Sequence, residues 1–275
     1  MIFLNKISTE FDKDFHQIIN FSINAHKRYR RYEINKRTGG KRSIHHPSPE
    51  LKSYQRFIAK HIFLQQPTHK SVFSYIKNKS IKDLANEHKK NRYLLRIDFK
   101  DFFPSIRGKN IRLFLNAKNK ELTDLELTII NLLVCKKDKL TIGAPSSPSI
   151  SNTILYDFDK EIYDMCEVKE IVYSRYADDL YFSTNKENQL STILDYIKTY
   201  KFPYEIELEV NNKKNVFTSK KHKRVITGLT ITTDGNISIG RKQKRLIKSL
   251  INSYRYDILD KEKIKYLKGY LSFLL

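Results

Sequence analysis

Two adjacent aspartates stand in the segment RYADDLYFST, residues 175–184, whose other members are mostly aromatic, aliphatic or hydroxylated. Asp178 and Asp179 lie where two half-buried strands over 171–182 would meet in a hairpin. Two carboxylates about 4 Å apart repel each other by roughly 4 kcal/mol at an effective dielectric of about 20. The pair could share a proton as an acid–base dyad, face water on a loose turn, or bind divalent cations.

A third carboxylate, Asp98, ends the apolar run YLLRIDF, residues 93–99, and Pro104 prevents the strand from continuing. Its charge at the end of a hydrophobic strand would be costly without a partner, such as a cap, a salt bridge or a metal. If strand 93–98 lies beside the hairpin, the three carboxylates converge as hard oxygen ligands, which magnesium prefers. Adjacent residues of a strand point to opposite faces, so Asp178 would be the direct ligand unless the turn is sharply bent. Two such ions, about 3.5–4 Å apart, would serve phosphoryl transfer by activating a hydroxyl and neutralising a departing pyrophosphate.

The composition points to a polyanionic partner. The chain has 275 residues, with 52 lysines and arginines against 30 aspartates and glutamates, which gives a formal net charge of +22. A charge of this size favours nucleic acid over an anionic membrane surface. No apolar run approaches the ~20 residues of a membrane span, and no secretory signal begins the chain. Two cysteines exclude a disulfide framework and suit the cytoplasm, and His45–His46 lacks neighbours at zinc spacing.

The remaining elements follow from apolar spacing, turn residues and caps. Gly39–Gly40 between extended segments predicts a hairpin, and Thr123 or Asp124 could cap a helix. A basic helix over 241–259 carries Leu246, Ile247, Leu250, Ile251 and Tyr254 on one face. The other predicted helices cover 50–63, 122–135 and the part of 143–165 that follows its Gly/Pro/Ser loop, and the other predicted strands cover 206–210, 224–231 and 236–240. Helices and strands alternate irregularly, which favours the α+β class over several independent domains.

The order of five blocks, RIDFKDFFPSI, GAPSSPSISN, YADD, VNNKKN and ITG, resembles the reverse transcriptases of bacterial retrons and, more distantly, those of group II introns. The resemblance runs from about Tyr29 to the end of the sequence. It implies a right-hand polymerase, with an antiparallel palm sheet that carries the carboxylates and a small helical thumb. The implied divisions are fingers over 1–92, palm with inserted fingers helices over 93–225, and palm end with thumb over 226–275.

The resemblance also implies roles for individual residues. Asp98, Asp178 and Asp179, with the Phe99 carbonyl, would hold two Mg²⁺ ions, for which Mn²⁺ could substitute. The implied nucleotide pocket comprises Arg42, which grips the triphosphate with Lys36 or Arg37 assisting, Phe103, which excludes a 2′-hydroxyl, Lys214, and the floor residues Gly143, Ala144 and Pro145. The loop that many relatives write as PQG here reads Thr141-Ile142-Gly143, so Ile142 stands in place of a glutamine.

Retron-type features imply the RNA contacts. LANEH, residues 84–88, resembles the NAxxH box although Leu84 replaces its asparagine, and ITG, residues 226–228, resembles the VTG triplet associated with RNA recognition. The expected RNA-binding residues are His88, Ile226, Thr227, Gly228, Arg241, Lys242, Lys244 and Arg245. The basic runs HKKNR, SKKHKR and GRKQKR, with 17 tyrosines and 16 phenylalanines, would add phosphate contacts and stacking surfaces, and each run alone could instead be a solvated face.

Retron enzymes start DNA synthesis from a guanosine 2′-hydroxyl of a structured noncoding RNA, and the bound RNA–DNA product acts with a separate effector protein in phage defence. The partners implied for this chain are therefore such an RNA and its cDNA, deoxynucleoside triphosphates and an effector protein, without a membrane. Two alternatives stay open: a group II intron-like or other defence-associated reverse transcriptase, and a non-catalytic RNA-binding scaffold. No maturase, endonuclease or ribonuclease H segment follows the matched blocks, which favours the retron type over the intron type.

Overall fold

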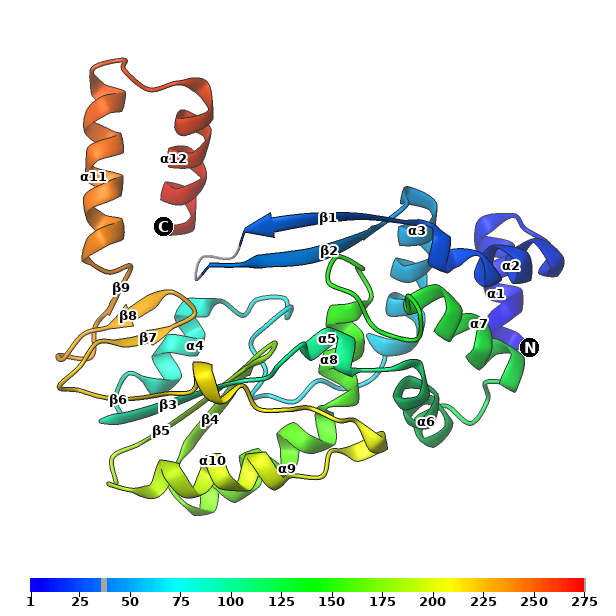
Figure 1. Ribbon diagram of the computed structural model, residues 1–275, viewed down its shortest axis with the longest axis horizontal. Coiled ribbons are helices and arrows are strands. Elements are labelled where there is room, and N and C mark those ends of the chain that lie inside the picture. Colours follow the sequence, from blue (N-terminus) through cyan, green and yellow to red (C-terminus); the bar gives the residue numbers. More distant parts are fainter. Residues whose placement is uncertain (36–38, 275) are drawn as a thin grey trace.

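The computed structural model describes residues 1–35 and 39–274, and it mixes helices with antiparallel strands as the α+β prediction expects (Figure 1). In this described part the strands form a two-stranded ribbon, a four-stranded sheet and a three-stranded sheet. Every pairing between the named strands is antiparallel. No described helix combines the length and the apolar character needed to cross a membrane.

The four-stranded sheet occupies the middle of the chain. Its strands follow the order β4 (Val172–Tyr176), β5 (Asp179–Thr184), β3 (Tyr93–Asp98) and β6 (Val216–Ser219). The predicted hairpin over 171–182 and the strand over 93–98 are both confirmed. They are neighbours, so the carboxylates expected at their ends meet at one edge of the sheet.

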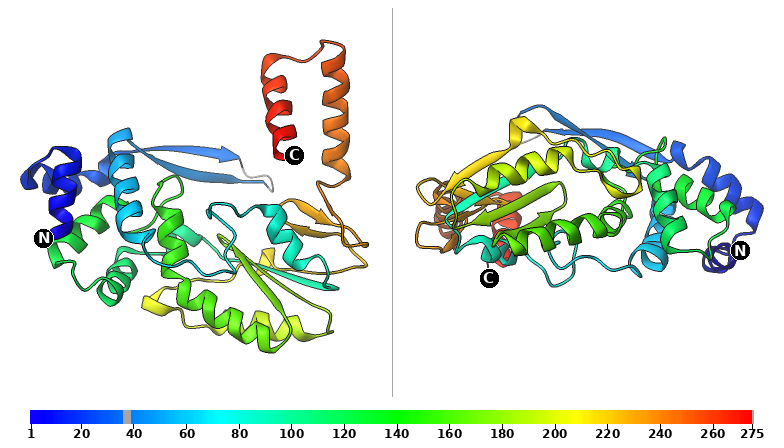
Figure 2. Two further views of the ribbon diagram at one scale, coloured as in Figure 1. Left: turned by 180° about the vertical axis from the view of Figure 1, so that it is seen from behind. Right: turned by 90° about the horizontal axis from the view of Figure 1, so that it is seen from below.

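One face of this sheet is apolar and packs on two helices, α9 (Tyr156–Val168) and α10 (Gln189–Thr199), which run along it in both views (Figures 1 and 2). Because side chains alternate along a strand, every second residue of β3 and β5 points into this core. These residues are Leu95, Ile97, Leu180 and Phe182.

The opposite face is divided between a second core and a polar region. Helix α4 (Ile81–His88) packs there with the small sheet β7 (Arg224–Ile226), β8 (Leu229–Ile231) and β9 (Ile237–Ser238). Leu94 and Tyr181 enter this second core from β3 and β5. The carboxylates lie beyond it, at the end of the same face.

Helices and a long ribbon make up the N-terminal part. The ribbon pairs β1 (Tyr29–Asn35) with β2 (Lys41–Pro47), which confirms the hairpin predicted around Gly39–Gly40. Lys36 and Arg37, the expected assistants of Arg42, lie outside the described residues. The helical elements here are α1 (Ile2–Phe11), α2 (Phe15–Ile23), η1 (Ala25–Lys27), α3 (Pro49–Ile58) and its π-helical continuation η2 (Ala59–Phe63).

The helices between β3 and β4 complete the main core. Thr123 caps α7 through a capping box with Glu126, as one of the two predicted caps. The helix predicted within 143–165 is broken at Leu155 into α8 and α9, and its apolar stripe is buried on both sides of the break. The elements are α5 (Phe102–Ser105), α6 (Gly108–Lys118), α7 (Asp124–Val134) and α8 (Ser147–Ile154).

The strand predicted at 206–210 is wrong. Between η3 (Pro203–Glu205) and η4 (Asn212–Lys214) the chain pairs with the sheet region only at an isolated bridge from Val210 to Phe99. The position beside β3 is taken by β6, which the sequence analysis missed. Ile206 and Val210 are nevertheless buried, so their alternation reports burial rather than strand pairing.

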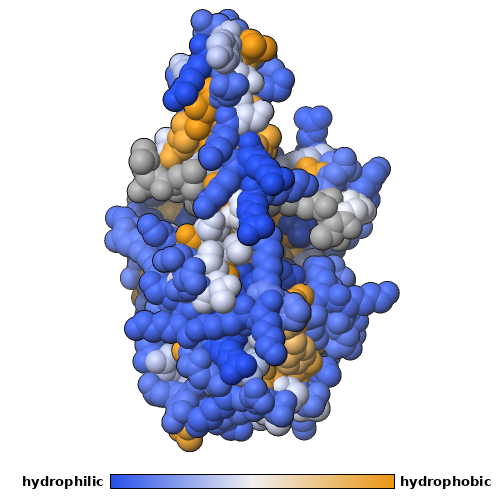
Figure 3. Space-filling model, turned by 90° about the vertical axis from the view of Figure 1, so that its left-hand side faces the viewer, coloured by the Kyte–Doolittle hydropathy of each residue, from blue (hydrophilic) through white to orange (hydrophobic). Residues whose placement is uncertain are grey.

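Two C-terminal helices, α11 (Arg241–Arg255) and α12 (Lys261–Leu274), stand side by side above the small sheet (Figure 1). The predicted apolar stripe of α11 is only partly covered: Ile247 is buried, whereas Leu246 and Tyr254 each keep 45% of their surface exposed. The face that includes this helical pair is largely hydrophilic, with apolar side chains gathered along the helices (Figure 3).

Candidate active site

Asp98 and Asp179 are direct cross-strand partners at the ends of β3 and β5. The amide of Phe99 donates to the carbonyl of Asp178 at 3.1 Å, so the preceding pair, Asp98 and Asp179, is a non-hydrogen-bonded one. In such pairs the Cα atoms are about 4.5 Å apart and both side chains point to the same face. The register of the sheet therefore forces these two carboxylates together.

Asp178 lies in the two-residue turn that joins β4 to β5. The register pairs Tyr176 with Asp179, and Ala177, the first turn residue, has a φ of 55°. A positive φ is unusual for a residue with a Cβ, and here it bends the chain sharply just before the aspartates. The sequence predicts Asp178 as the direct ligand unless the turn is sharply bent. With this bend, Asp179 can serve the same site as Asp178.

Protein cations hold two of the carboxylates. Lys214, from η4, donates to both oxygens of Asp98 at 2.9 Å, and the side-chain amide of Asn211 donates to Oδ1 at 3.2 Å. Arg96 Nε lies 3.5 Å from Asp179 Oδ1 without forming a hydrogen bond, and the Tyr181 hydroxyl donates to Asp179 Oδ2 at 3.3 Å.

The electrostatic environment disfavours the charged form of the other two carboxyls. Burial and the neighbouring charge of Asp98 raise the pKa of Asp178, against the opposing effect of Lys214 and Arg42. Burial raises the pKa of Asp179 to about 6, with Asp178 and Asp98 adding to the increase and Arg96 opposing it. The negative charge of the cluster is therefore incompletely compensated by the protein.

The donor chemistry of the cluster fits a divalent cation. Three carboxylates are hard oxygen ligands, and Asp179 Oδ1 is buried without a hydrogen-bond donor. Among the described residues, no three histidine, cysteine or acidic side chains already stand in an arrangement that would hold one ion. In this structure Asp98 faces Lys214 and Asp179 faces Arg96, so ion binding requires these side chains to turn.

Of the residues expected at the nucleotide, Arg42 and Lys214 act on the carboxylates directly. Arg42 is exposed on β2, close enough to Asp178 to affect its pKa. Phe103 is half-buried on α5, where its ring packs edge-to-face with that of Phe102, with the ring centroids 5.3 Å apart. Phe99 is buried directly after Asp98, and its amide is bonded to Asp178.

Gly143 lies where the 141–146 loop meets β2. Its φ is 110°, and a Cβ there would stand 2.8 Å from the His45 carbonyl oxygen, so both conformation and space require glycine. The amide of His45 donates to the Ile142 carbonyl at 3.0 Å. Ala144 is buried and Pro145 is half-buried beside it. The loop therefore joins the ribbon to the main core through backbone contacts. The contact at Ile142 uses its carbonyl and does not involve its side chain.

The predicted RNA-binding residues divide into exposed and buried sets. The four basic residues of α11, namely Arg241, Lys242, Lys244 and Arg245, are exposed, as is Gly228. Ile226 is buried, and Thr227 is half-buried in the turn between β7 and β8. The Thr227 amide donates to the Tyr181 hydroxyl at 3.2 Å, so this turn is one hydrogen bond from a residue that contacts Asp179.

His88 does not fit the expectation of an RNA contact. Its imidazole is buried beneath α4, where Nδ1 pairs with the Ser183 hydroxyl at 2.8 Å, and burial lowers its pKa to about 3. Arg224, within the basic run SKKHKR, is likewise buried and donates to the carbonyls of Asn91 and Thr232. These two side chains hold β5, α4 and the small sheet together and offer no surface to RNA.

Sequence reasoning missed Arg96, Tyr181 and Asn211. The first two could have been found, because Arg96 and Asp98, like Tyr181 and Asp179, are two residues apart and share a strand face. Asn211 could not, since the irregular segment before β6 brings it to Asp98.

Comparison with known proteins agrees with this geometry. The family model described as reverse transcriptase (RNA-dependent DNA polymerase) matches residues 34–267. The chain is 36% identical over 257 residues to the Retron Ec83 reverse transcriptase of Escherichia coli, covering 89% of this chain and 81% of the relative. It is 31% identical to the Retron Ec73 enzyme, over 89% and 81%, and 30% identical to the Retron Ec86 enzyme, over 90% and 76%, both also from Escherichia coli.

Solved structures show the same fold. Apo telomerase from Candida tropicalis, truncated from its C-terminal domain, superposes with a TM-score of 0.52 at 14% identity over 76% of this chain and 54% of that one. Telomerase from Candida albicans, in complex with a fragment of telomeric RNA, gives 0.53 at 13% identity over 84% and 50%. The chain spans about half the length of these telomerases, and the likeness confirms the right-hand polymerase fold. The chain belongs to the reverse transcriptase family, as an RNA-directed DNA polymerase of the retron type.

Proposed function

We propose that this reverse transcriptase copies part of a structured noncoding RNA into DNA from a guanosine 2′-hydroxyl of that RNA. The product would be multicopy single-stranded DNA that stays linked to its RNA and serves, with a separate effector protein, in antiphage defence. The observation that carries the catalytic part is the direct cross-strand pairing of Asp98 with Asp179 beside Asp178. The similarity to retron enzymes supports the product.

In this proposal Asp98, Asp178 and Asp179, with the Phe99 carbonyl, would hold Mg²⁺ or, in its place, Mn²⁺. When bound, the ions supply the positive charge that lowers the pKa of an attacking hydroxyl and neutralises a departing pyrophosphate. The protein contributes placement, because the carboxylates come from adjacent, rigidly paired strands. Arg96 and Tyr181 hold the Asp179 carboxylate from its own sheet face.

The residues around the cluster would bind a deoxynucleoside triphosphate. Arg42 on β2 and Lys214 on η4 are far apart in the sequence, but the charges of both act on Asp178. A triphosphate bound between them would meet two cations. Phe103 would fill the space that a ribose 2′-hydroxyl needs. Gly143, Ala144 and Pro145 would form the floor by fixing the loop against β2.

The RNA would lie along α11 and the small sheet. Four basic residues are exposed on the first turns of α11, namely Arg241, Lys242, Lys244 and Arg245. The Thr227–Gly228 turn is hydrogen-bonded to Tyr181, which in turn contacts Asp179. We retain the division into fingers (1–92), palm (93–225) and palm end with thumb (226–275) as part of this proposal. We also propose that the protein works in the cytoplasm, where its buried cysteines, Cys135 and Cys166, stay reduced.

One experiment tests the proposed product. The protein is purified from cells that express its native locus, and the bound nucleic acid is extracted and treated with ribonuclease and, separately, with a 2′,5′-debranching enzyme. A short DNA whose gel mobility changes on debranching is the expected result. Linear cDNA that is indifferent to debranching would replace the proposal with a differently primed reverse transcriptase. RNA without DNA would replace it with a non-catalytic RNA-binding scaffold.

A further inference from the structure

Ala177 sets the direction of the two aspartates that follow it. Its φ of 55° lies in the left-handed region, which a residue with a Cβ adopts only when its surroundings hold it there. Glycine would adopt this conformation freely, so the choice of alanine leaves the turn dependent on external contacts.

Both backbone polar groups of Ala177 are held by side chains outside the turn, one from the preceding strand and one from a distant segment. Its amide donates to the Ser74 hydroxyl at 2.8 Å, and its carbonyl accepts from Arg175 Nη1 at 3.3 Å. Ser74 follows a segment that bridges to β4 in parallel, in which the Arg175 amide donates to the Ser71 carbonyl and the Phe73 amide donates to the Arg175 carbonyl. The serine is thus fixed beside the turn by the edge of the sheet.

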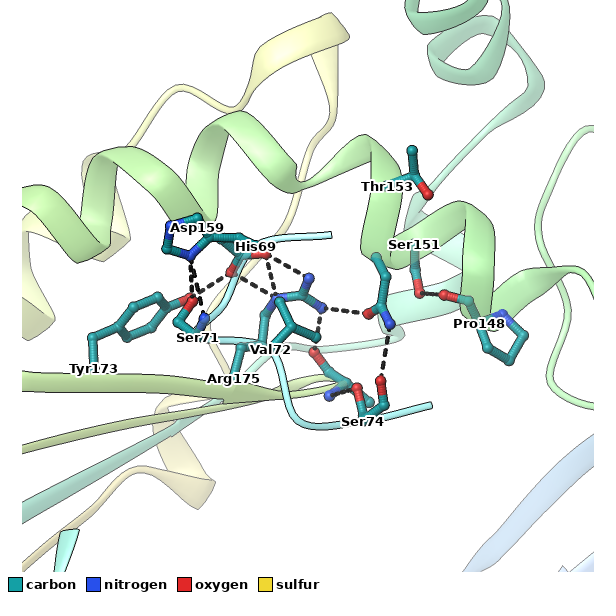
Figure 4. Close-up of polar contacts among 12 residues, drawn as sticks. His69, Ser71, Val72, Ser74, Pro148, Ser151, Thr153, Asp159, Tyr173 and Arg175 are labelled. Carbon is teal, nitrogen blue, oxygen red and sulfur yellow. Dashed lines mark hydrogen bonds and ion pairs between the residues drawn. The ribbon is translucent and has the colours of Figure 1, made fainter. Parts of the chain in front are cut away.

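Arg175 is itself fixed by a fully buried ion pair with Asp159 of α9 (Figure 4). Its Nε donates to Oδ1 at 2.8 Å and its Nη2 donates to Oδ2 at 2.6 Å, while the Tyr173 hydroxyl donates to Oδ1 at 2.8 Å. Burial alone would lower the pKa of Arg175, but the charge and hydrogen bonds of Asp159 outweigh it and raise this pKa.

Asn152 of α8 closes the network. Its side-chain oxygen accepts from Arg175 Nη1 at 3.3 Å, and its side-chain amide donates to the Ser74 carbonyl at 2.9 Å. The two groups that hold Ala177 are therefore connected to each other through Asn152, and Asp159 holds Arg175 in place.

Stability alone does not account for a buried ion pair at this place. Replacing such a pair with apolar residues of similar volume is often neutral or stabilising, and the surrounding core is apolar. We propose that Arg175, Asp159 and Ser74 are positioning residues that hold Ala177 in the left-handed conformation and so aim Asp178 and Asp179 at the metal. This inference rests on the proposed metal-binding role of the aspartates.

A matched pair of serine variants tests the inference in the full-length protein. Ser74→Ala removes the acceptor of the Ala177 amide, whereas Ser71→Ala removes a buried hydroxyl of the same segment that bonds to the ring of His69 at 2.9 Å. Mn²⁺ affinity is measured by electron paramagnetic resonance on protein without RNA or nucleotide, alongside thermal unfolding. We expect Ser74→Ala to bind Mn²⁺ about tenfold more weakly, and Ser71→Ala to stay within about twofold of the wild type.

Adding Ala177→Gly separates positioning from general damage. Glycine needs no external contact at a positive φ, so Ser74→Ala with Ala177→Gly should recover Mn²⁺ affinity to within about threefold of the wild type. Equal losses in the two serine variants, or an unchanged affinity in Ser74→Ala, would overturn the inference. Failure of Ala177→Gly to restore any affinity would do so as well.

An apolar replacement gives an independent measurement. The variant with Asp159→Leu, Tyr173→Phe and Arg175→Met should keep the folded state, as apolar substitutes for buried ion pairs often do, and should still lose Mn²⁺ affinity. Wild-type affinity in this folded variant would also overturn the inference. Asp178→Asn distinguishes the underlying proposal: if Mn²⁺ affinity does not depend on Asp178, the proposed metal site fails, whatever the serine variants do.

Discussion

The ammonium group of Lys214 lies 2.9 Å from both carboxylate oxygens of Asp98. The Asp98 side chain is almost completely buried, whereas that of Lys214 is still partly exposed to solvent. A divalent ion that binds Asp98 must compete with this contact. The same lysine would then be released close to where a triphosphate is proposed to bind.

Lys214→Met should therefore separate metal binding from nucleotide use. Without the competing ammonium group, we expect the nucleotide-free protein to bind Mn²⁺ several-fold, roughly threefold to tenfold, more tightly. Nucleotide incorporation should fall, because a cation proposed to contact the triphosphate is lost. Electron paramagnetic resonance and single-nucleotide extension measure the two effects. Lys213→Met, which removes an adjacent exposed charge, is the control, and weaker Mn²⁺ binding in Lys214→Met would contradict the competition.

Asp179→Asn should stabilise the protein without metal while abolishing DNA synthesis. Because the pKa of Asp179 is raised to about 6, keeping it ionised at pH 8 lowers the free energy of unfolding. With about 1.4 kcal/mol for each pKa unit, we expect a gain of roughly 1 to 3 kcal/mol, reduced by the lost Arg96 contact. Urea unfolding in the presence of a chelator measures it, and Asp101→Asn, at an exposed position, provides the control. A loss of stability in Asp179→Asn would show that Arg96 already compensates the charge.

Phe103→Ala should admit ribonucleotides. The half-buried ring is proposed to fill the space of a 2′-hydroxyl, so its removal should raise ribonucleotide incorporation relative to deoxynucleotide incorporation by one or more orders of magnitude, equivalent to at least ~1.4 kcal/mol. The ratio of kcat/KM values for the two substrates measures this change. Phe103→Tyr keeps the ring and should keep the discrimination. Unchanged selectivity in the alanine variant would remove Phe103 from the nucleotide pocket.

The basic residues of α11 should contribute to the salt dependence of RNA binding. Each neutralised phosphate contributes about 0.7 to 0.9 to the slope of log affinity against log salt concentration. Lys244→Gln with Arg245→Gln should therefore flatten the slope by roughly 1 to 2. A matched loss of two charges, Lys6→Gln with Lys13→Gln at exposed positions on and just after α1, should leave the slope unchanged. Equal effects at both places would indicate a general charge effect instead of a binding surface.

His88 should make the protein sensitive to acid. Its pKa is about 3 in the folded state, where it is buried, against about 6.5 in an unfolded chain. The unfolded state therefore takes up a proton first, and stability falls as the pH drops below about 6.5. Between pH 7 and 5 the loss attributable to this group is about 2 kcal/mol. His88→Gln should remove that part of the loss, as measured by the difference between variant and wild type in urea unfolding, and an identical pH profile would contradict the assignment.

Short runs of apolar and strand-favouring residues, bounded by turn signals, predicted the strands in the central part of the molecule correctly. Leu95, Ile97, Leu180 and Phe182 required a sheet with one buried face, and that sheet pairs Asp98 with Asp179. The same rule failed at 206–210, where Ile206 and Val210 are buried without forming a strand, because β6 already occupies the edge beside β3. Local periodicity reports burial, whereas strand order depends on contacts distant in sequence.

The candidate site was predictable where its residues belong to paired strands and unpredictable where loops deliver them. Asn211 reaches Asp98 from an irregular segment more than a hundred positions later. Lys214, from the same segment, was named only through the family resemblance as a nucleotide contact, and its bond to Asp98 was not foreseen. Arg224 illustrates the opposite error, since its place in the basic run SKKHKR suggested an exposed residue, while its bonds to the carbonyls of Asn91 and Thr232 hold it buried. Charge density in a sequence does not show which members of a run face water.

The alternation in β3 has one last consequence, for the fidelity of folding. If β3 slipped by one residue against β5, Ile97 would move to the polar face and Asp98 would enter the apolar core between the sheet and helices α9 and α10. The misaligned fold would be destabilised by the desolvation of the Asp98 carboxylate, whether or not substrate is present. The buried apolar side chains of β3 and β5, which contact no nucleotide, thus enforce the strand register that aligns the catalytic carboxylates.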